Sequence, residues 1–153
     1  MGNPYRRPTL IPAIFYKDPF RALDWLEAAF GFERAMVITD QEGNLGHSEM
    51  RVGDGTIMVG PEWNADVASP ASVAGKNTQC VHVHLEDGID AHCARARRAG
   101  AEILSEPEEQ FYGDCVYRAR DPEGHVWVFS QTVKAVTREE AEQASGLRIE
   151  GWV

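Results

Sequence analysis

Two pairs of polar side chains occupy alternating positions in stretches of the sequence that read as strands. His82 and His84 alternate with apolar residues over 81–85, and His47 and Glu49, followed by Arg51, alternate with Ser48, Met50 and Val52. Alternate residues of a β-strand point to one face, about 6.6 Å apart, which for two histidines is compatible with metal chelation. His47 and Glu49 are compatible with an acid/base pair. Simple polarity of a half-solvated face or of an exposed edge strand explains either pair as well.

The elements that position these residues follow the same order twice. Each half of the chain is predicted to form a strand, a helix that ends at a glycine, and three further strands. In the first half these elements cover residues 10–16, 20–30, 33–39, 45–52 and 56–60. In the second half they cover residues 79–86, 89–99, 102–105, 115–120 and 125–131, with a Pro-containing acidic loop before 115.

The two halves are related by one constant offset. Four pairs of matching residues are each 69 positions apart: Asp18 and Asp87, Gly31 and Gly100, Gly55 and Gly124, Val59 and Val128. Such agreement indicates an internal duplication of a βαβββ module. We therefore expect one domain over 8–134, with module one at 8–60, a linker at 61–77 and module two at 78–134. Trp63, in the linker, is interpreted as a hydrophobic plug beneath it, with stacking on a ligand as the alternative.

The paired modules and two motifs resemble the vicinal oxygen chelate superfamily. Gly31-Phe32 ends the first helix, and Asp121-Pro122-Glu123-Gly124-His125 leads into the last strand. Tyr112-Gly113-Asp114, ahead of that turn, is most similar to the glyoxalase/bleomycin-resistance subgroup. The resemblance as a whole covers about residues 8–134. The resemblance implies an α+β fold in which the two modules form a curved mixed sheet around a ligand cavity, with the helices outside. It also implies a homodimer, often with modules paired across chains.

Catalytic members of this superfamily hold a divalent metal with His, Gln or Glu from the first and last strands of each module. The resemblance places these positions at Ile11, Val59 and Val128, with Cys80 or Val81 as the fourth. Alternation over 81–85 favours Cys80. Hydrocarbon side chains offer no donor atoms, and a single thiol does not hold zinc. The resident metal site is therefore expected to be absent.

Strand alternation and the resemblance together give a set of candidate ligand contacts. Arg118 can bind a carboxylate or phosphate through its planar guanidinium, or can pair with Glu49 or stay hydrated. Tyr112 is expected at the mouth of the cavity. The candidate ligand-binding residues are His47, Glu49, His82, His84, Tyr112 and Arg118, and no residue is assigned as catalytic.

These features favour a binding protein for an unidentified small molecule, without a cofactor. The alternative is a metal-dependent lyase or isomerase of glyoxalase type, with Zn, Ni, Mn or Fe in a rearranged site of His82, His84 and Glu49. Whether the protein is an enzyme thus stays open at this point. A third possibility is a scaffold that serves only oligomerisation.

Composition and charge exclude several other classes. The 153 residues carry 15 Lys and Arg against 24 Asp and Glu, a formal charge of −9 that disfavours nucleic-acid and membrane partners. No apolar run approaches the roughly 18 residues of a spanning helix, and residues 1–7 do not form a secretory signal. Three widely spaced cysteines indicate free thiols and a cytoplasmic location.

The segment 135–153 lies outside the duplicated modules. Thr137 and Glu140 have the spacing of a capping box, which predicts a short helix to Ala144. Apolar residues follow this helix, among them Leu147 and Trp152. They are expected to dock on the domain or on a second subunit.

Overall fold

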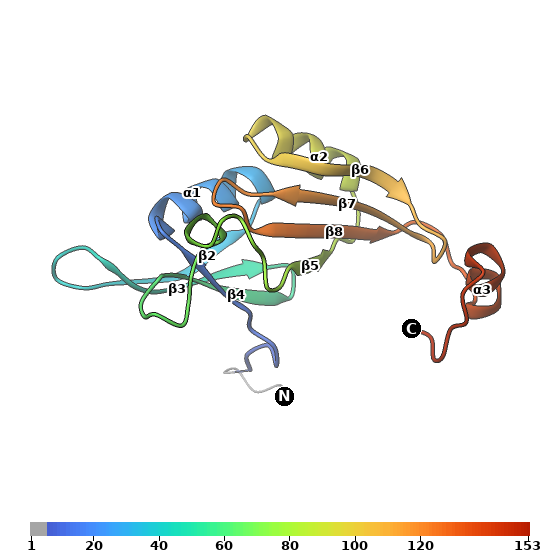
Figure 1. Ribbon diagram of the computed structural model, residues 1–153, viewed down its shortest axis with the longest axis horizontal. Coiled ribbons are helices and arrows are strands. Elements are labelled where there is room, and N and C mark those ends of the chain that lie inside the picture. The colour runs from blue at the N-terminus through green and yellow to red at the C-terminus, as the bar shows by residue number, and fades with distance from the viewer. Residues whose placement is uncertain (1–5) are drawn as a thin grey trace.

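The computed structural model describes residues 6–153, which form two βαβββ modules followed by a C-terminal helix (Figure 1). Module one contains β1 (Ala13–Tyr16), α1 (Pro19–Phe30), β2 (Glu33–Thr39), β3 (Leu45–Val52) and β4 (Gly55–Pro61). Module two contains β5 (Val81–His84), α2 (Ile89–Arg98), β6 (Glu102–Glu109), β7 (Asp114–Arg120) and β8 (Val126–Thr132). A 3-10 helix, η1 (Pro70–Ser72), lies between the modules, and α3 (Arg138–Ser145) follows them. None of the helices within residues 6–153 is long and apolar enough to cross a membrane.

Each module forms its own mixed four-stranded sheet, so the chain contains two sheets rather than one continuous curved sheet. The strand orders are β1-β4-β3-β2 and β5-β8-β7-β6. In both sheets the first strand runs parallel to the last, and the other neighbours are antiparallel. Helix α1 packs on one face of the first sheet and α2 on one face of the second. We call the face opposite each helix the open face of that sheet.

Strand alternation distributes the side chains of β5 as the sequence predicts. Val83 is buried in the core and Val81 packs against it, whereas His82 and His84 are exposed. Because alternate residues share a face, both histidines lie on the open face of the second sheet.

The hydrophobic core is continuous across the two modules. Phe30, at the end of α1, packs against Trp127 and Phe129 of β8, with ring centroids 5.6 and 4.7 Å apart. Phe32 also contacts Trp127, at 5.4 Å. These aromatic side chains attach the covered face of one module to that of the other.

A buried carboxylate in the β7–β8 turn links the modules by hydrogen bonds. Asp121 Oδ2 accepts from the hydroxyl of Tyr16 at 2.6 Å and from Nε1 of Trp127 at 3.1 Å. Its Oδ1 accepts from the backbone N–H groups of Glu123 and His125. Burial, with the nearby Asp121 charge, raises the pKa of Tyr16 well above its ordinary value, so the phenol stays a donor. The turn that marks the family resemblance is thus a structural junction.

Glu123, in the same turn, holds the start of module one's helix. Its two carboxylate oxygens accept from the backbone N–H groups of Lys17 and Asp18, at 2.7 and 2.9 Å. The hydroxyl of Ser69 in the linker donates to the same carboxylate at 2.6 Å. One side chain therefore joins module one, the linker and module two.

Strand β6 is longer than the sequence predicts. The acidic segment after Ser105 was expected to be a loop, but it stays paired with β7 up to Glu109. The pairing register shifts between Ser105 and Glu108, around Pro107. Proline is tolerated at an edge strand and at a bulge, which explains how this strand continues past it.

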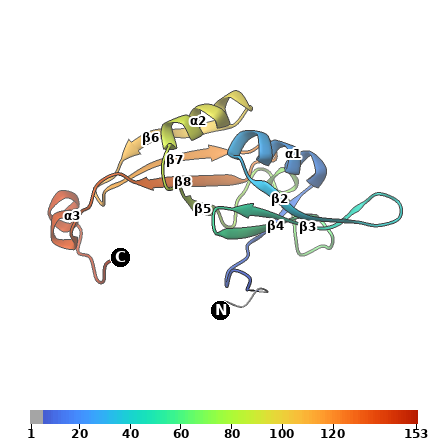
Figure 2. The same ribbon diagram turned by 180° about the vertical axis from the view of Figure 1, so that it is seen from behind.

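The C-terminal segment forms a separate projection. Thr137 and Glu140 make the expected capping box at the start of α3. Figures 1 and 2, which view the molecule from opposite sides, both place α3 beyond the end of the second sheet, far from α1. The indole N–H of Trp152 donates to the carbonyl of Val136 at 3.2 Å, so the tail folds back on the segment that leads into α3.

Candidate ligand-binding site

Glu49 is the central residue of the candidate site on the first sheet. It lies on the open face of β3, between Met36 of β2 and Met58 of β4, and only 6% of its surface is exposed. His47 Nε2 donates to Glu49 Oε2 at 2.8 Å, and Arg7 forms an ion pair with Oε1. These partners hold the pKa of Glu49 below its ordinary value, the His47 hydrogen bond contributing most. The structure thus joins His47 and Glu49 and adds Arg7 to them.

Arg7 could not be assigned from the sequence, because it precedes every predicted element and lies 42 positions before Glu49. The only signal was a basic pair, Arg6-Arg7, just ahead of the first strand. Pairing of Arg118 with Glu49, one of the interpretations of the sequence, is wrong. Arg118 is exposed on β7, and the Glu49 carboxylate binds Arg7 and His47 instead.

On the second sheet, a row of polar groups crosses the open face from β5 to β7. The hydroxyl of Ser130 lies 3.2 Å from Nδ1 of His84, and that of Thr132 lies 3.5 Å from Nε2. Thr132 also donates to Asp114 at 2.8 Å. His82 and Arg118, on the same face, are exposed. This face can therefore donate and accept hydrogen bonds along several positions.

Tyr112 lies apart from the other candidate residues. It occupies the turn between β6 and β7, packs edge-on against Phe111 and remains exposed. The neighbouring Gly113 carbonyl accepts from the N–H groups of Val133 and Lys134, which places this turn beside the segment leading to α3. Tyr112 lines neither the hollow between the modules nor the one beneath the linker.

The larger of these hollows is a cleft of about 730 Å³ between the modules. Its floor includes Phe30 and Phe32, and the β3–β4 turn and the end of β5 form its sides. Among the candidate residues, His84 lines this cleft. The polar positions found by alternation therefore lie mainly on the open faces.

Comparison with known families decides how this architecture is classified. A family model described as the Glyoxalase/Bleomycin resistance protein/Dioxygenase superfamily matches residues 10–129, which include both modules. The chain belongs to this superfamily.

This superfamily member is similar to uncharacterized proteins and to proteins whose structures are solved. Uncharacterized proteins of Mycobacterium bovis and Mycobacterium tuberculosis are 27% identical over 147 residues, covering 94% of this chain and 96% and 86% of their own lengths. The crystal structure of TioX from Micromonospora sp. ML1 is 30% identical, covers 81% of this chain and 98% of TioX, and has a TM-score of 0.63. A superfamily protein from Nocardioides shares the fold at 15% identity, with coverage of 84% and 86% and a TM-score of 0.56.

The superfamily's metal positions can now be located in space, and one predicted position is wrong. Val59 is only 1% exposed and packs in the core beneath α1, rather than on the open face. Arg118 is the counterpart of Glu49 in module two, and it is paired with Val128 in the last strand. Glu49 is paired with Met58, so Met58 rather than Val59 is the equivalent of Val128. The 69-residue offset becomes 70 in the last strand, because five residues, 121–125, separate the paired residues Arg120 and Val126, whereas four, 52–55, separate the equivalent pair Arg51 and Thr56.

The side chains at the corrected positions do not fit the superfamily's metal. Val81 packs against the core, so alternation places Cys80 on the open side. Cys80 is the equivalent in module two of Ile11 in module one. The four positions thus carry Ile11, Met58, Cys80 and Val128, which offer only sulfur donors. Magnesium, calcium and manganese take oxygen ligands, and zinc takes three or four protein ligands, which a single thiol does not supply. Within residues 6–153, no three His, Cys, Asp or Glu side chains converge on one metal position.

Proposed function

We propose that this superfamily member binds a small molecule on the open faces of its sheets, without a metal at the inherited positions. The group formed by Arg7, Glu49 and His47 carries this proposal. A nearly buried, ionised carboxylate fixes two side chains that retain further nitrogen atoms for hydrogen bonding, among the apolar side chains of Met36 and Met58. A few oriented polar groups in an apolar surround are typical of ligand sites.

The second sheet supplies complementary contacts in this proposal. His82, His84 and Arg118 provide nitrogen donors or acceptors on its open face, and Tyr112 borders that sheet at its far end. The guanidinium of Arg118 suits a ligand carboxylate or phosphate. Free Cys80, Cys93 and Cys115 support a function in the reducing cytoplasm.

The proposal includes a homodimer in which modules of two chains face one another. Met36, Val37 and Ile38 of β2 are 38–50% exposed, an apolar strip that a second copy can cover. Ile38→Glu places a charge in that interface and is expected to raise the dimer dissociation constant by about tenfold or more. Light scattering after size exclusion measures the mass across a dilution series. Phe20→Glu, an exposed apolar residue of α1 outside this strip, is the control, and a wild-type monomer at high concentration contradicts the dimer.

A thermal-shift panel of aromatic acids, amines and neutral heterocycles tests the binding function. At least one class should raise Tm saturably, since ligands that bind only the native state stabilise it. His47→Gln and Arg118→Gln should each weaken that ligand about tenfold, the effect of losing one charge-assisted hydrogen bond. Arg138→Gln on the projecting α3 is the matched control. Unchanged affinity in both site variants would refute the proposed location.

Metal analysis of the purified protein separates binding from the metal-dependent alternative. We expect Zn, Ni, Mn and Fe to be substoichiometric. A stoichiometric metal that disappears on His82→Ala would instead support a glyoxalase-type lyase or isomerase with a rearranged centre.

A further inference from the structure

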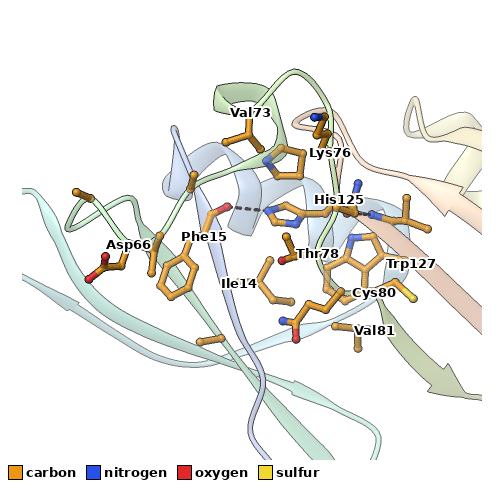
Figure 3. A pocket seen from close by; sticks show the side chains of 18 residues that line it. Ile14, Phe15, Asp66, Val73, Lys76, Thr78, Cys80, Val81, His125 and Trp127 are labelled. Carbon is orange, nitrogen blue, oxygen red and sulfur yellow. Dashed lines mark hydrogen bonds between the residues drawn. The ribbon is translucent and has the colours of Figure 1, made fainter.

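A second hollow lies beneath the linker and contains none of the six candidate residues. It measures about 390 Å³ and lies between the segment 65–80, the start of β1 and the starts of β5 and β8 (Figure 3). We call it the linker hollow. Its size falls within the range of small-molecule sites.

Hydrogen bonds at both ends of the linker hold this hollow open. At one end, the backbone N–H of Ser69 donates to the Glu62 carboxylate at 2.9 Å, and the Ser69 hydroxyl donates to Glu123 at 2.6 Å. At the other end, Asn77 donates to the carbonyl of Gly124 at 2.9 Å and accepts from the N–H of Val126 at 3.1 Å. Both ends are thus attached to the β7–β8 turn, and the chain between them spans the hollow as an ordered cover.

The lining combines apolar walls with one cation at the rim. Figure 3 shows Phe15 on one side and Val73 and Lys76 at the opposite rim, with the Asp66 carboxylate turned away from the other lining side chains. Lys76 forms no ion pair within residues 6–153. Thr78, two residues further on, adds a hydroxyl donor to the same lining. An available ammonium beside an apolar hollow suits a molecule with an anionic head and a hydrocarbon body.

We propose that the linker hollow is a separate binding site for an amphipathic monocarboxylate, with its carboxylate at Lys76 and its chain between Phe15 and Val73. This site includes none of the six candidate residues of the open faces, so either site can exist without the other.

Cys80 provides a direct reporter for occupancy of the linker hollow. It is exposed and lines the hollow, whereas Cys115 lies on β7 outside it. Iodoacetamide labelling of both cysteines, followed by peptide mass spectrometry, is carried out with and without octanoate. Saturating octanoate is expected to slow alkylation of Cys80 at least fivefold, roughly, while Cys115 is unaffected, because a bound chain covers one thiol and not the other. Equal rates at Cys80 with and without octanoate would overturn the proposal.

The head group and its partner are tested by matched ligands and variants. Octylamine should give no protection, and octanol should bind at least tenfold more weakly, roughly, because neither presents an anion to the ammonium. Lys76→Gln should weaken octanoate by a similar factor. Lys134→Gln, which removes a lysine outside the hollow, should leave octanoate binding unchanged. Protection by octylamine equal to that by octanoate, or unchanged binding in Lys76→Gln, would refute a carboxylate site.

Discussion

Replacing Asp121 by alanine is expected to lower the free energy of unfolding by about 3–5 kcal/mol, the cost of removing one partner from a buried polar network. The side chain of Asp121 satisfies the Tyr16 hydroxyl and the Trp127 indole N–H, and both donors lie in the core. After the substitution each donor is buried without an acceptor, and the turn loses two hydrogen bonds to its own backbone. Urea unfolding followed by tryptophan fluorescence measures the change.

Two comparison variants show whether this cost comes from the network. Tyr16→Phe removes a single hydrogen bond and leaves Asp121 with its other donors, so it should cost about 1 kcal/mol. Asp54→Ala, at the position 69 residues before Glu123, alters an exposed carboxylate and should change stability by less than about 0.5 kcal/mol. If Asp121→Ala behaved like Asp54→Ala, the junction would not be a source of stability.

The duplicated architecture could be predicted because its signals are local. Helix-ending glycines, turn residues and strand alternation depend on a few neighbouring residues, and they recur at one spacing in both halves. The same alternation placed His82 and His84 on the face opposite the core. The order of the strands and helices, and the faces on which strand residues lie, can therefore be predicted from the sequence alone.

Features that depend on distant contacts could not be predicted in the same way. One additional residue in the β7–β8 connection shifts the last strand, so Val59 faces the core and Met58 takes the open position. Trp63, interpreted as a plug beneath the linker, is 68% exposed. Arg7 forms an ion pair with Glu49 of β3, and no pattern in residues 6–12 predicts this contact. Each of these outcomes is decided by tertiary packing rather than by local composition.

His92 makes a further contact between the modules, and this contact depends on the protonation state of the imidazole. In the neutral imidazole, Nε2 donates to the carbonyl of Phe30 at 3.2 Å, and Nδ1 accepts from the hydroxyl of Tyr117 at 2.5 Å. Burial lowers the pKa of His92, and the nearby charge of Arg95 lowers it further. Burial also raises the pKa of Tyr117, which keeps its hydroxyl available as the donor. Protonation of His92 therefore removes an acceptor at the joint between α1 and module two.

The depressed pKa of His92 predicts the direction in which stability changes with pH. The unfolded chain binds a proton near pH 6.5 and the folded chain only below that, so the contribution is complete above pH 6.5 and is lost on acidification. Between pH 7.5 and 5.5, the free energy of unfolding of the wild type should fall more than that of His92→Gln, whose amide does not titrate. Urea unfolding at each pH measures this difference. Parallel profiles for the wild type and His92→Gln would show that the imidazole is not held neutral, because a group whose pKa is unchanged by folding adds nothing to the pH dependence.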